Sequence, residues 1–547
     1  MKFVKKGIWL LFLVVLLILI GCGSDETDSS EEADSETESE SATTDDSTET
    51  ETNDDAEEVE SNGEVKIAIN AQPPTLDPHM TTAGATTDVG KMMFESLLTI
   101  DSKYNPVPML AESVDVNDDN TVFTFHLREG VLFHNGDEMT SDDVVASMNR
   151  WKEMSGVASN TLGDAEFVAL DDYTVEIELE QSSGIALGVI SSSEQFAAIM
   201  PKEVIESAAE DGVTEYIGTG PYEFVEWKQD QYIHYEKFAD YAPVDREPDG
   251  ISGKKEVFID DVYFYVVTDT STRLAGIQSG EYDIAYALPE DNYEQLLDNP
   301  DLDVQTVYTA NMDLLYNKRG GLMQDLKMRQ AVNAAINIDD ILLASLVNED
   351  LYRADASYMS VDIEQWATEI GGENYNINDA EKAQALFDEA GYDGESIILM
   401  TTRDYEHYYN ASVVIKEQLE QIGINAELEV YDWPTIVDRR EEDDAWDLFV
   451  NAYPFKSDPT QLLQLSPEFA GGINDEKADE LLAAIRTAET PEEAVEYWED
   501  LQEYAWTDYL PMTKLGSFGS VYAFSKNVEN AKVGPGGVVI WNAKIAE

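Results

Sequence analysis

The sequence predicts an α/β protein with a mixed sheet, and two observations carry this prediction. Helical patterns over residues 379–390 and 407–422, each followed by a glycine, alternate with strand patterns over 397–401 and 424–431. This β-α-β rhythm is typical of α/β domains. The chain of 547 residues is 43 % hydrophobic, and at about 150 residues per domain it is long enough for about three domains with packed cores.

The first 21 residues have the pattern of a secretory leader. Lys2, Lys5 and Lys6 precede an unbroken apolar run over residues 7–20. A membrane-spanning helix needs about 20 apolar residues, so this shorter run indicates a signal-peptide core. The run leads into Leu-Ile-Gly-Cys, and Cys22 is the only cysteine of the chain, which excludes an internal disulfide and a multi-thiolate metal site.

Residues 23–64 differ in composition from the rest of the chain. They are rich in Asp, Glu, Ser and Thr and contain no Lys, Arg or aromatic residue. Such a segment has too little apolar area to offset the entropy cost of ordering, so we expect an extended acidic tether. An acidic cation-binding tail is the alternative.

The folded part begins at about residue 65 with a strand over 65–69. Two further strands, over 121–127 and 173–179, each follow an Asp-Asp pair that supplies a turn. A tight turn at 134–137 leads to a capping box at 140–143, which opens a helix through about residue 154. Residues 218–270 are rich in strands. Helices at about 476–488 and 491–508 precede a tail of short strands and turns.

The charge balance limits the possible functions. Asp and Glu number 112 against 33 Lys and Arg, giving a net charge of −79. Nucleic-acid binding is excluded, because affinity for phosphate backbones depends on Lys and Arg. The five histidines are scattered, and no spacing is typical of a catalytic set, a metal site or a cofactor-binding loop. We therefore expect no enzyme, no cofactor and no metal, and we read the acidity as a sign of a saline or alkaline exterior.

Eight segments, in order, resemble the extracytoplasmic solute-binding proteins of peptide and nickel ABC importers, the dipeptide/oligopeptide-binding family. Residues 123–151 (FTFHLREGVLFHNGDEMTSDDVVASMNRW) match the family signature most closely. The others are 74–79 (PTLDPH), 94–98 (FESLL), 110–113 (LAES), 218–222 (GTGPY), 280–284 (GEYDI), 328–332 (MRQAV) and 383–391, which ends in Glu-Ala-Gly before Tyr392. The Leu-Ile-Gly-Cys run resembles a bacterial lipoprotein signal, which makes Cys22 the lipidated, palmitate-bearing N-terminus.

The resemblance implies a periplasmic-binding-protein-like fold, with two lobes around a cleft and an additional inserted α+β domain. Residues 1–21 are then the signal peptide and 22–64 the lipidated cysteine and tether. Lobe I is expected from 65–101, 216–268 and 511–547, the inserted domain from 102–215, and lobe II from 269–510. The block at 123–151 is expected in the inserted domain, away from the ligand.

The resemblance also implies the site. Arg403 stands where relatives hold the ligand carboxylate, and a guanidinium grips a carboxylate through two parallel bonds. Tyr453 stands at a cleft aromatic position. Phe455 or Lys456 replaces the Asp that takes the ligand amine, so Asp458 would have to substitute for it. The remaining candidates, from the loop at 81–86, are Thr82, Gly84 and Thr86.

We therefore expect a monomeric lipoprotein on the outer face of the cytoplasmic membrane. It captures a peptide or peptide-like solute by two-lobe closure and delivers it to the permease and ATPase subunits of an ABC importer. A nickel chelate or another non-peptide solute is an alternative ligand. A surface-anchored peptidase, and a tethered sensor or adhesin, are alternatives of other classes.

Overall fold

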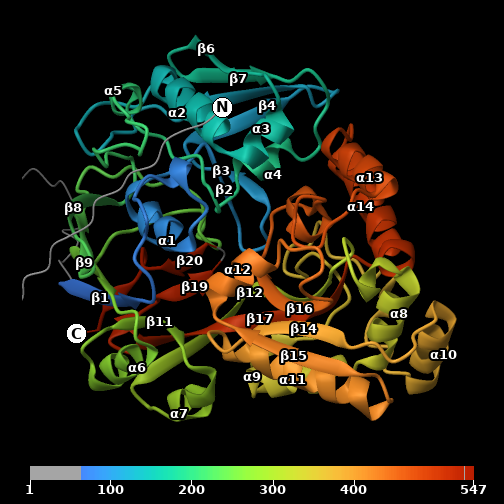
Figure 1. Ribbon diagram of the computed structural model, residues 1–547. Coiled ribbons are helices and arrows are strands. Elements are labelled where there is room, and N and C mark those ends of the chain that lie inside the picture. Colours follow the sequence, from blue (N-terminus) through green and yellow to red (C-terminus); the bar gives the residue numbers. More distant parts are fainter. Residues whose placement is uncertain (1–62, 535, 547) are drawn as a thin grey trace, which may run out of the picture. The chain divides into compact units, whose positions relative to one another are not determined.

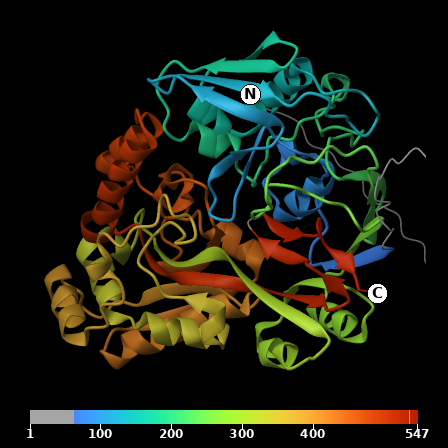
Figure 2. The same ribbon diagram turned by 180° about the vertical axis from the view of Figure 1, so that it is seen from behind.

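Two long antiparallel strands lie at the centre of the computed structural model, which describes residues 63–534 and 536–546 (Figure 1). They are β12 (Leu302–Tyr316) and β17 (Met512–Ser525), and they pair from Leu302 opposite Ser525 to Leu315 opposite Met512. Figure 2 shows them running side by side from behind. They belong to an eleven-stranded sheet in the order β15-β14-β16-β12-β17-β11-β1-β10-β9-β8, with β13 paired to β17.

The other strands of this sheet lie on either side of the central pair. On one side β14 is parallel to β15 and β16, and on the other β1 is parallel to β10 and β11, while the remaining pairs are antiparallel. The sheet is therefore mixed, and the predicted α/β class is confirmed. The bounds are β1 (Glu64–Ile69), β8 (Tyr222–Lys228), β9 (Tyr232–Lys237), β10 (Asp261–Val266), β11 (Ile284–Leu288), β13 (Tyr352–Arg353), β14 (Ile397–Thr402), β15 (Ala426–Tyr431) and β16 (Leu448–Pro454).

A separate four-stranded antiparallel sheet has the order β4-β5-β7-β6 and packs against α2 and α3. Its strands are β4 (Ala111–Val116), β5 (Val122–Leu127), β6 (Phe167–Asp171) and β7 (Thr174–Glu178). Three two-stranded ladders complete the sheets: β2 (Leu98–Ile100) with β3 (Pro106–Pro108), β18 (Val528–Glu529) with β21 (Lys544–Ile545), and β19 (Lys532–Gly534) with β20 (Gly537–Val539).

The helices follow the patterns read from the sequence. The expected capping box is present, with Thr140 as N-cap of α2 and Asp143 bonded back to it, and Gly391 ends α10 in the left-handed region at φ 77°. The bounds are α1 (Gly84–Met93), α2 (Ser141–Met154), α3 (Gly156–Leu162), α4 (Ala186–Ile190), α5 (Lys202–Glu206), α6 (Thr270–Ser279), α7 (Tyr293–Leu297), α8 (Leu326–Ala335), α9 (Ile338–Leu346), α10 (Ala380–Ala390), α11 (Glu406–Gln421), α12 (Trp433–Arg439), α13 (Glu476–Arg486) and α14 (Pro491–Tyr504).

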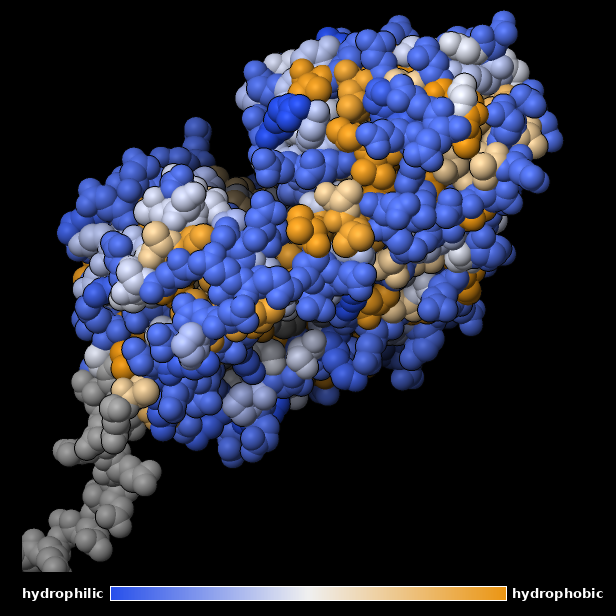
Figure 3. All heavy atoms as spheres, turned by 90° about the horizontal axis from the view of Figure 1, so that it is seen from below, coloured by the Kyte–Doolittle hydropathy of each residue, from blue (hydrophilic) through white to orange (hydrophobic). Residues whose placement is uncertain are grey.

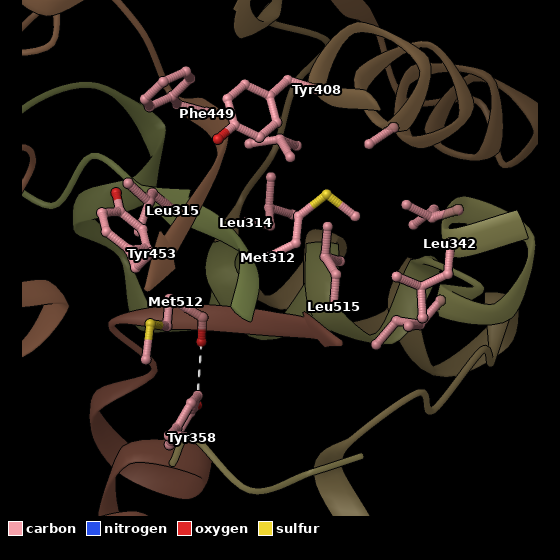
Figure 4. Close-up of a cluster of buried hydrophobic side chains, with 14 of the residues drawn as sticks. Met312, Leu314, Leu315, Leu342, Tyr358, Tyr408, Phe449, Tyr453, Met512 and Leu515 are labelled. Atoms are coloured by element: carbon pink, nitrogen blue, oxygen red, sulfur yellow. Dashed lines mark hydrogen bonds between the residues drawn. The ribbon is translucent and has the colours of Figure 1, made fainter. Parts of the chain in front are cut away.

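The central strands are held by a buried apolar cluster, drawn in Figure 4. Met312 and Leu314 of β12 and Met512 and Leu515 of β17 are each at most 1 % exposed. The hydroxyl of Tyr358 donates a 3.2 Å hydrogen bond to the carbonyl oxygen of Met512. One expectation for this region is wrong: the tail after residue 508 is not made only of short strands, because it contains the 14-residue β17.

A buried ionic cluster holds the segment at residues 77–79 against α2. Two nitrogens of the Arg150 guanidinium donate to the Asp77 carboxylate, at 3.2 and 2.6 Å, and one of them also donates to Nδ1 of His79 at 2.9 Å. His79 Nε2 then donates to the Ala198 carbonyl. Asp77 and His79 are fully buried, so the Asp-Pro-His part of the family motif has a structural role: it fixes this segment to α2.

The surface agrees with the composition. The face shown in Figure 3 is mostly hydrophilic, with apolar residues in small separate groups. Within the described residues, no helix has both the length and the apolar character needed to cross a membrane, and no three His, Cys, Asp or Glu side chains are grouped to hold a metal. The predicted leader, Cys22 and nearly all of the tether, up to residue 62, lie outside the described residues.

Candidate ligand cavity

The chain places three loops at one edge of the main sheet. The parallel strands β14, β15 and β16 end at Thr402, Tyr431 and Pro454, and their next residues are therefore neighbours at that edge. In open α/β sheets, ligands bind outside the carboxyl ends of the strands. Arg403 follows β14, and Phe455, Lys456 and Asp458 follow β16.

A cavity of about 260 Å³ lies beside the loop that follows β16. This is just below the range of about 300–1,000 Å³ that is usual for ligand pockets. Two groups of residues line it, which we call the N-terminal wall and the C-terminal wall. The N-terminal wall consists of Ile100, Tyr104, Pro106, Asn120, Phe123, Ser183, Gly184, Ile185, Leu187, Gly188, Ser192, Ser193 and Glu194. The C-terminal wall consists of Ile363, Gln365, Trp366, Phe455, Lys456, Ser457, Asp458 and Pro491.

The segment that precedes α14, next to Pro491 of the C-terminal wall, is bonded directly to the N-terminal side. The backbone N–H of Gly184 donates to the Ala488 carbonyl at 3.0 Å, and the Ser182 hydroxyl donates to the Thr487 carbonyl at 3.0 Å. The amide of Asn120 donates to the Glu489 carbonyl at 2.5 Å. The structure therefore shows the cavity with its walls in contact.

Lys456 is joined to the opposite wall by an ion pair. Its ammonium lies 2.9 and 3.1 Å from the two carboxylate oxygens of Glu194. The two side chains are 17 % and 27 % exposed, so the pair is largely shielded from solvent. Both residues line the cavity.

Asp458 also lines the cavity, but its carboxylate is fully used within its own loop. It accepts hydrogen bonds from the backbone N–H and hydroxyl of Thr460 and from the amide of Gln461. In this way it caps the short 3₁₀ helix Pro459–Gln461. Burial raises the pKa of the Asp458 carboxyl, and these hydrogen bonds oppose the shift. Asp458 thus has a structural role here.

Tyr453 belongs to the buried core. Its side chain is 8 % exposed, and its hydroxyl accepts a 2.9 Å hydrogen bond from the Asn451 amide. Figure 4 shows it among the apolar side chains of the central strands. It does not line the cavity described above, although it borders a much smaller pocket that also reaches Lys456.

Arg403 is not brought together with Lys456. Its side chain is exposed, its guanidinium lies 3.7 Å from the ring centre of Tyr409, and it donates to the Tyr409 hydroxyl. Arg403 is absent from the cavity lining. Arg403 is therefore an exposed cation at the strand edge, and it contacts the ring and the hydroxyl of Tyr409.

The candidates from residues 81–86 lie at the start of α1 and do not line the cavity. Thr82 and Gly84 are exposed, whereas Thr86 is buried and donates a 2.6 Å hydrogen bond to the Thr75 carbonyl.

Sequence reasoning missed most of the N-terminal wall. Glu194 follows three serines in an irregular segment and belongs to no motif. As one of 112 acidic residues it carries no signal of its own. Phe123, the first residue of the 123–151 block, also lines the cavity, although the resemblance implied that this block lies away from the ligand.

The chain matches known proteins along most of its length. The sequence model of the bacterial extracellular solute-binding proteins, family 5 Middle, matches residues 105–468. A probable peptide ABC transporter periplasmic-binding protein of Sinorhizobium fredii is 29 % identical over 474 residues, which is 83 % of this chain and 88 % of the relative. The oligopeptide-binding protein AppA of Bacillus subtilis is 24 % identical over 507 residues, which is 86 % of this chain and 89 % of the relative.

Solved structures show the same fold. The ABC transporter substrate-binding protein CtaP of Listeria monocytogenes superposes with a TM-score of 0.79 at 20 % identity, covering 89 % of this chain and all of CtaP. AppA of Bacillus subtilis, solved in complex with a nonapeptide, superposes with a TM-score of 0.70 at 22 % identity and with the same coverage. With its cavity beside the carboxyl ends of parallel strands and a family match over most of its length, the chain belongs to the bacterial extracellular solute-binding proteins of family 5.

Proposed function

We propose that this protein captures a peptide or peptide-like solute in the cavity between its two walls and delivers it to the permease and ATPase subunits of an ABC importer. The observation that carries the proposal is the cavity itself, which is lined by residues far apart in the sequence and is spanned by the Glu194–Lys456 ion pair. The names of the relatives support a peptide as the solute.

Closure of the walls is the proposed mechanism. A ligand that touches both walls stabilises the closed state by its differential affinity for that state, and the permease then recognises the closed, loaded form. Exclusion of water from the closed cavity strengthens each polar contact with the ligand. We propose that the division into two lobes and an inserted domain, as expected from the sequence, is the basis of this motion.

The ligand contacts remain proposals as well. Arg403 is proposed to receive the ligand carboxylate by leaving Tyr409, and Thr82, Gly84 and Thr86 are proposed to contribute at the start of α1. Tyr453 is proposed to support the cavity from beneath rather than to touch the ligand, because its hydroxyl is already bonded to Asn451.

The proposed setting is the outer face of the cytoplasmic membrane. Lipid on Cys22 would hold the protein there, since several acyl chains anchor a protein stably at about 0.8 kcal/mol per buried methylene. The anchored protein is proposed to be a monomer.

Mass spectrometry of the ligand that co-purifies with the protein tests the function. We expect short peptides, confirmed by calorimetric titration of the synthetic compounds. Stoichiometric nickel in the purified protein would instead indicate a metal chelate. Cleavage of a labelled peptide during incubation would indicate a peptidase.

A further inference from the structure

Each charged side chain of the cavity has a partner within the protein. Three charged side chains line it, namely Glu194, Lys456 and Asp458. The Asp458 carboxylate is bonded to Thr460 and Gln461. The carboxylate of Glu194 is held at both oxygens by the Lys456 ammonium. Among the described lining residues, Glu194 is thus the one carboxylate that could exchange its partner for an ammonium group of a ligand.

Both partners of this pair are held by their neighbours in the chain. Before Lys456, the N–H of Phe455 donates a 3.0 Å hydrogen bond to the Thr309 carbonyl of β12. After Glu194, the Gln195 amide donates to the His79 carbonyl at 2.7 Å, and the Gln195 carbonyl accepts from the Trp151 indole at 2.6 Å. The residues next to both partners are therefore anchored to other parts of the chain, which fixes where the two side chains of the pair start.

The rest of the lining is suited to uncharged groups. Phe123, Ile363 and Trp366 supply apolar surface, and Ser192 and Ser193 supply hydroxyls that can donate or accept. A free ammonium placed here would lose its water without gaining a carboxylate, and burying an unpaired charge is strongly unfavourable.

We propose that the Glu194–Lys456 pair determines ligand specificity: the Lys456 ammonium occupies the carboxylate that a free ligand amine would need, so the cavity accepts an uncharged or N-blocked end. This inference rests on the proposed function as a peptide-binding protein. In this inference Glu194 can accept a ligand amine, but its carboxylate is already paired with the ammonium of Lys456.

The test uses two tetrapeptide libraries of the same random composition, one with free N-termini and one N-acetylated. Native mass spectrometry reports the fraction of protein bound by each library at equal concentration. For the wild-type protein we expect the N-acetylated library to be bound in the larger fraction, by about threefold or more, because a free ammonium finds no available carboxylate in the cavity. In Lys456→Gln, which frees the Glu194 carboxylate, the free-amine library should be favoured by about tenfold or more, as expected for a new charge-assisted hydrogen bond. The double variant Lys456→Gln/Glu194→Gln should lose this preference.

A matched control separates specificity from closure. Lys103 and Glu364 also form an ion pair, at 2.8 Å, but their side chains are 57 % and 64 % exposed and neither lines the cavity. Lys103→Gln should leave the library ratio unchanged, and thermal melting checks that every variant folds.

The possible outcomes are distinct. Binding by Lys456→Gln with an unchanged ratio, or binding of free amines by the wild type that equals or exceeds binding of acetylated peptides, overturns this inference and leaves the peptide function standing. Failure of the wild type to bind either library overturns both the inference and the proposed function.

Discussion

The backbone N–H of Gly184 donates a 3.0 Å hydrogen bond to the carbonyl oxygen of Ala488 and so joins the N-terminal wall of the cavity to the segment that precedes α14. A side chain at this position is excluded, because a Cβ on Gly184 would lie 2.6 Å from the Thr490 carbonyl oxygen. The hydrogen bonds of Ser182 and Asn120 to the neighbouring carbonyls depend on the same close approach. The closed arrangement of the walls therefore requires glycine at residue 184.

Gly184→Ala should weaken ligand binding without touching the ligand. The added methyl group would clash with the Thr490 carbonyl and keep these two segments apart. Part of the free energy of ligand binding would then be used to bring them together. We expect a loss of affinity of about tenfold or more by calorimetric titration, and a larger radius of gyration in solution scattering. Gly156→Ala is the matched control, because a Cβ there meets nothing within 4 Å. Equal affinities for both variants would show that this contact does not control closure.

Arg403→Ala should weaken binding of peptides that have a free C-terminus. The guanidinium now rests on Tyr409, and an exposed cation–π contact contributes only about 0.5–1 kcal/mol. A charged partner lost from a closed cleft costs roughly 2–5 kcal/mol. A ligand carboxylate can thus draw Arg403 away from the ring, and we expect a loss of about 30-fold or more in affinity.

Amidation of the peptide provides the second half of that experiment. Amidated peptide should bind the wild type as weakly as free peptide binds Arg403→Ala, and amidation should change little in the variant. Tyr409→Phe keeps the ring beneath the guanidinium and is the control. Undiminished binding by Arg403→Ala would show that another group holds the carboxylate.

Acid should destabilise the fold through His79. Burial, aided by the Arg150 charge, lowers the pKa of His79 from 6.5 to about 4, so the folded state keeps this imidazole neutral while the unfolded chain protonates it. Stability is therefore lost as the pH falls below about 6.5, by about 2 kcal/mol between pH 7 and 5 for one such group. Chemical denaturation of the wild type and of His79→Gln at pH 7 and pH 5 measures this loss of unfolding free energy. The variant should lose less stability on acidification. Equal losses would show that His79 is not the group responsible.

Local patterns predicted much of this fold. The helices at α2, α10 and α11 and the strands at β14 and β15 lie within two residues of their expected bounds, because capping residues, terminal glycines and amphipathic periods are local signals. The long strand β12 carries no such signal. Its register against β17 shifts between Tyr308 and Ala310 and again between Met312 and Asp313, so its burial does not alternate regularly.

The cavity was harder to predict than the fold. The sequence points to Lys456 because this residue departs from a family pattern, but its partner Glu194 lies 262 residues away in the chain. Such a pair forms only when the folded chain brings distant segments together, and the local pattern of hydrophobic residues carries no information about that. Asp458 is a candidate because of its position next to Pro459, and the structure shows that its carboxylate caps the following turn. The residue types were informative, whereas their partners required the three-dimensional structure.

Cys22→Ser should block processing of the N-terminal leader. If Cys22 is the lipidated N-terminus, the variant keeps its leader and remains held by the apolar run at residues 7–20. Cell fractionation with immunoblotting should then show a heavier precursor in the membrane fraction. Gly23→Ala, next to the cysteine, serves as the control and should be processed normally. A mature band of normal size from Cys22→Ser would refute lipidation at this residue.

Salt should raise the melting temperature of the folded part, expressed without its leader and tether. The whole chain carries 112 acidic against 33 basic residues, and like charges on one surface repel each other and destabilise the compact state. The Debye length falls from about 10 Å at 0.1 M salt to about 3 Å at 1 M, which screens this repulsion. We therefore expect the melting temperature to rise between 0.1 and 2 M NaCl in differential scanning calorimetry. The rise should shrink at pH 4.5, where many exposed carboxylates take up protons, since there is then less repulsion to screen. An equal rise at both pH values would indicate a general salting effect, and a flat response at pH 7 would mean that the acids are too widely spaced to repel one another.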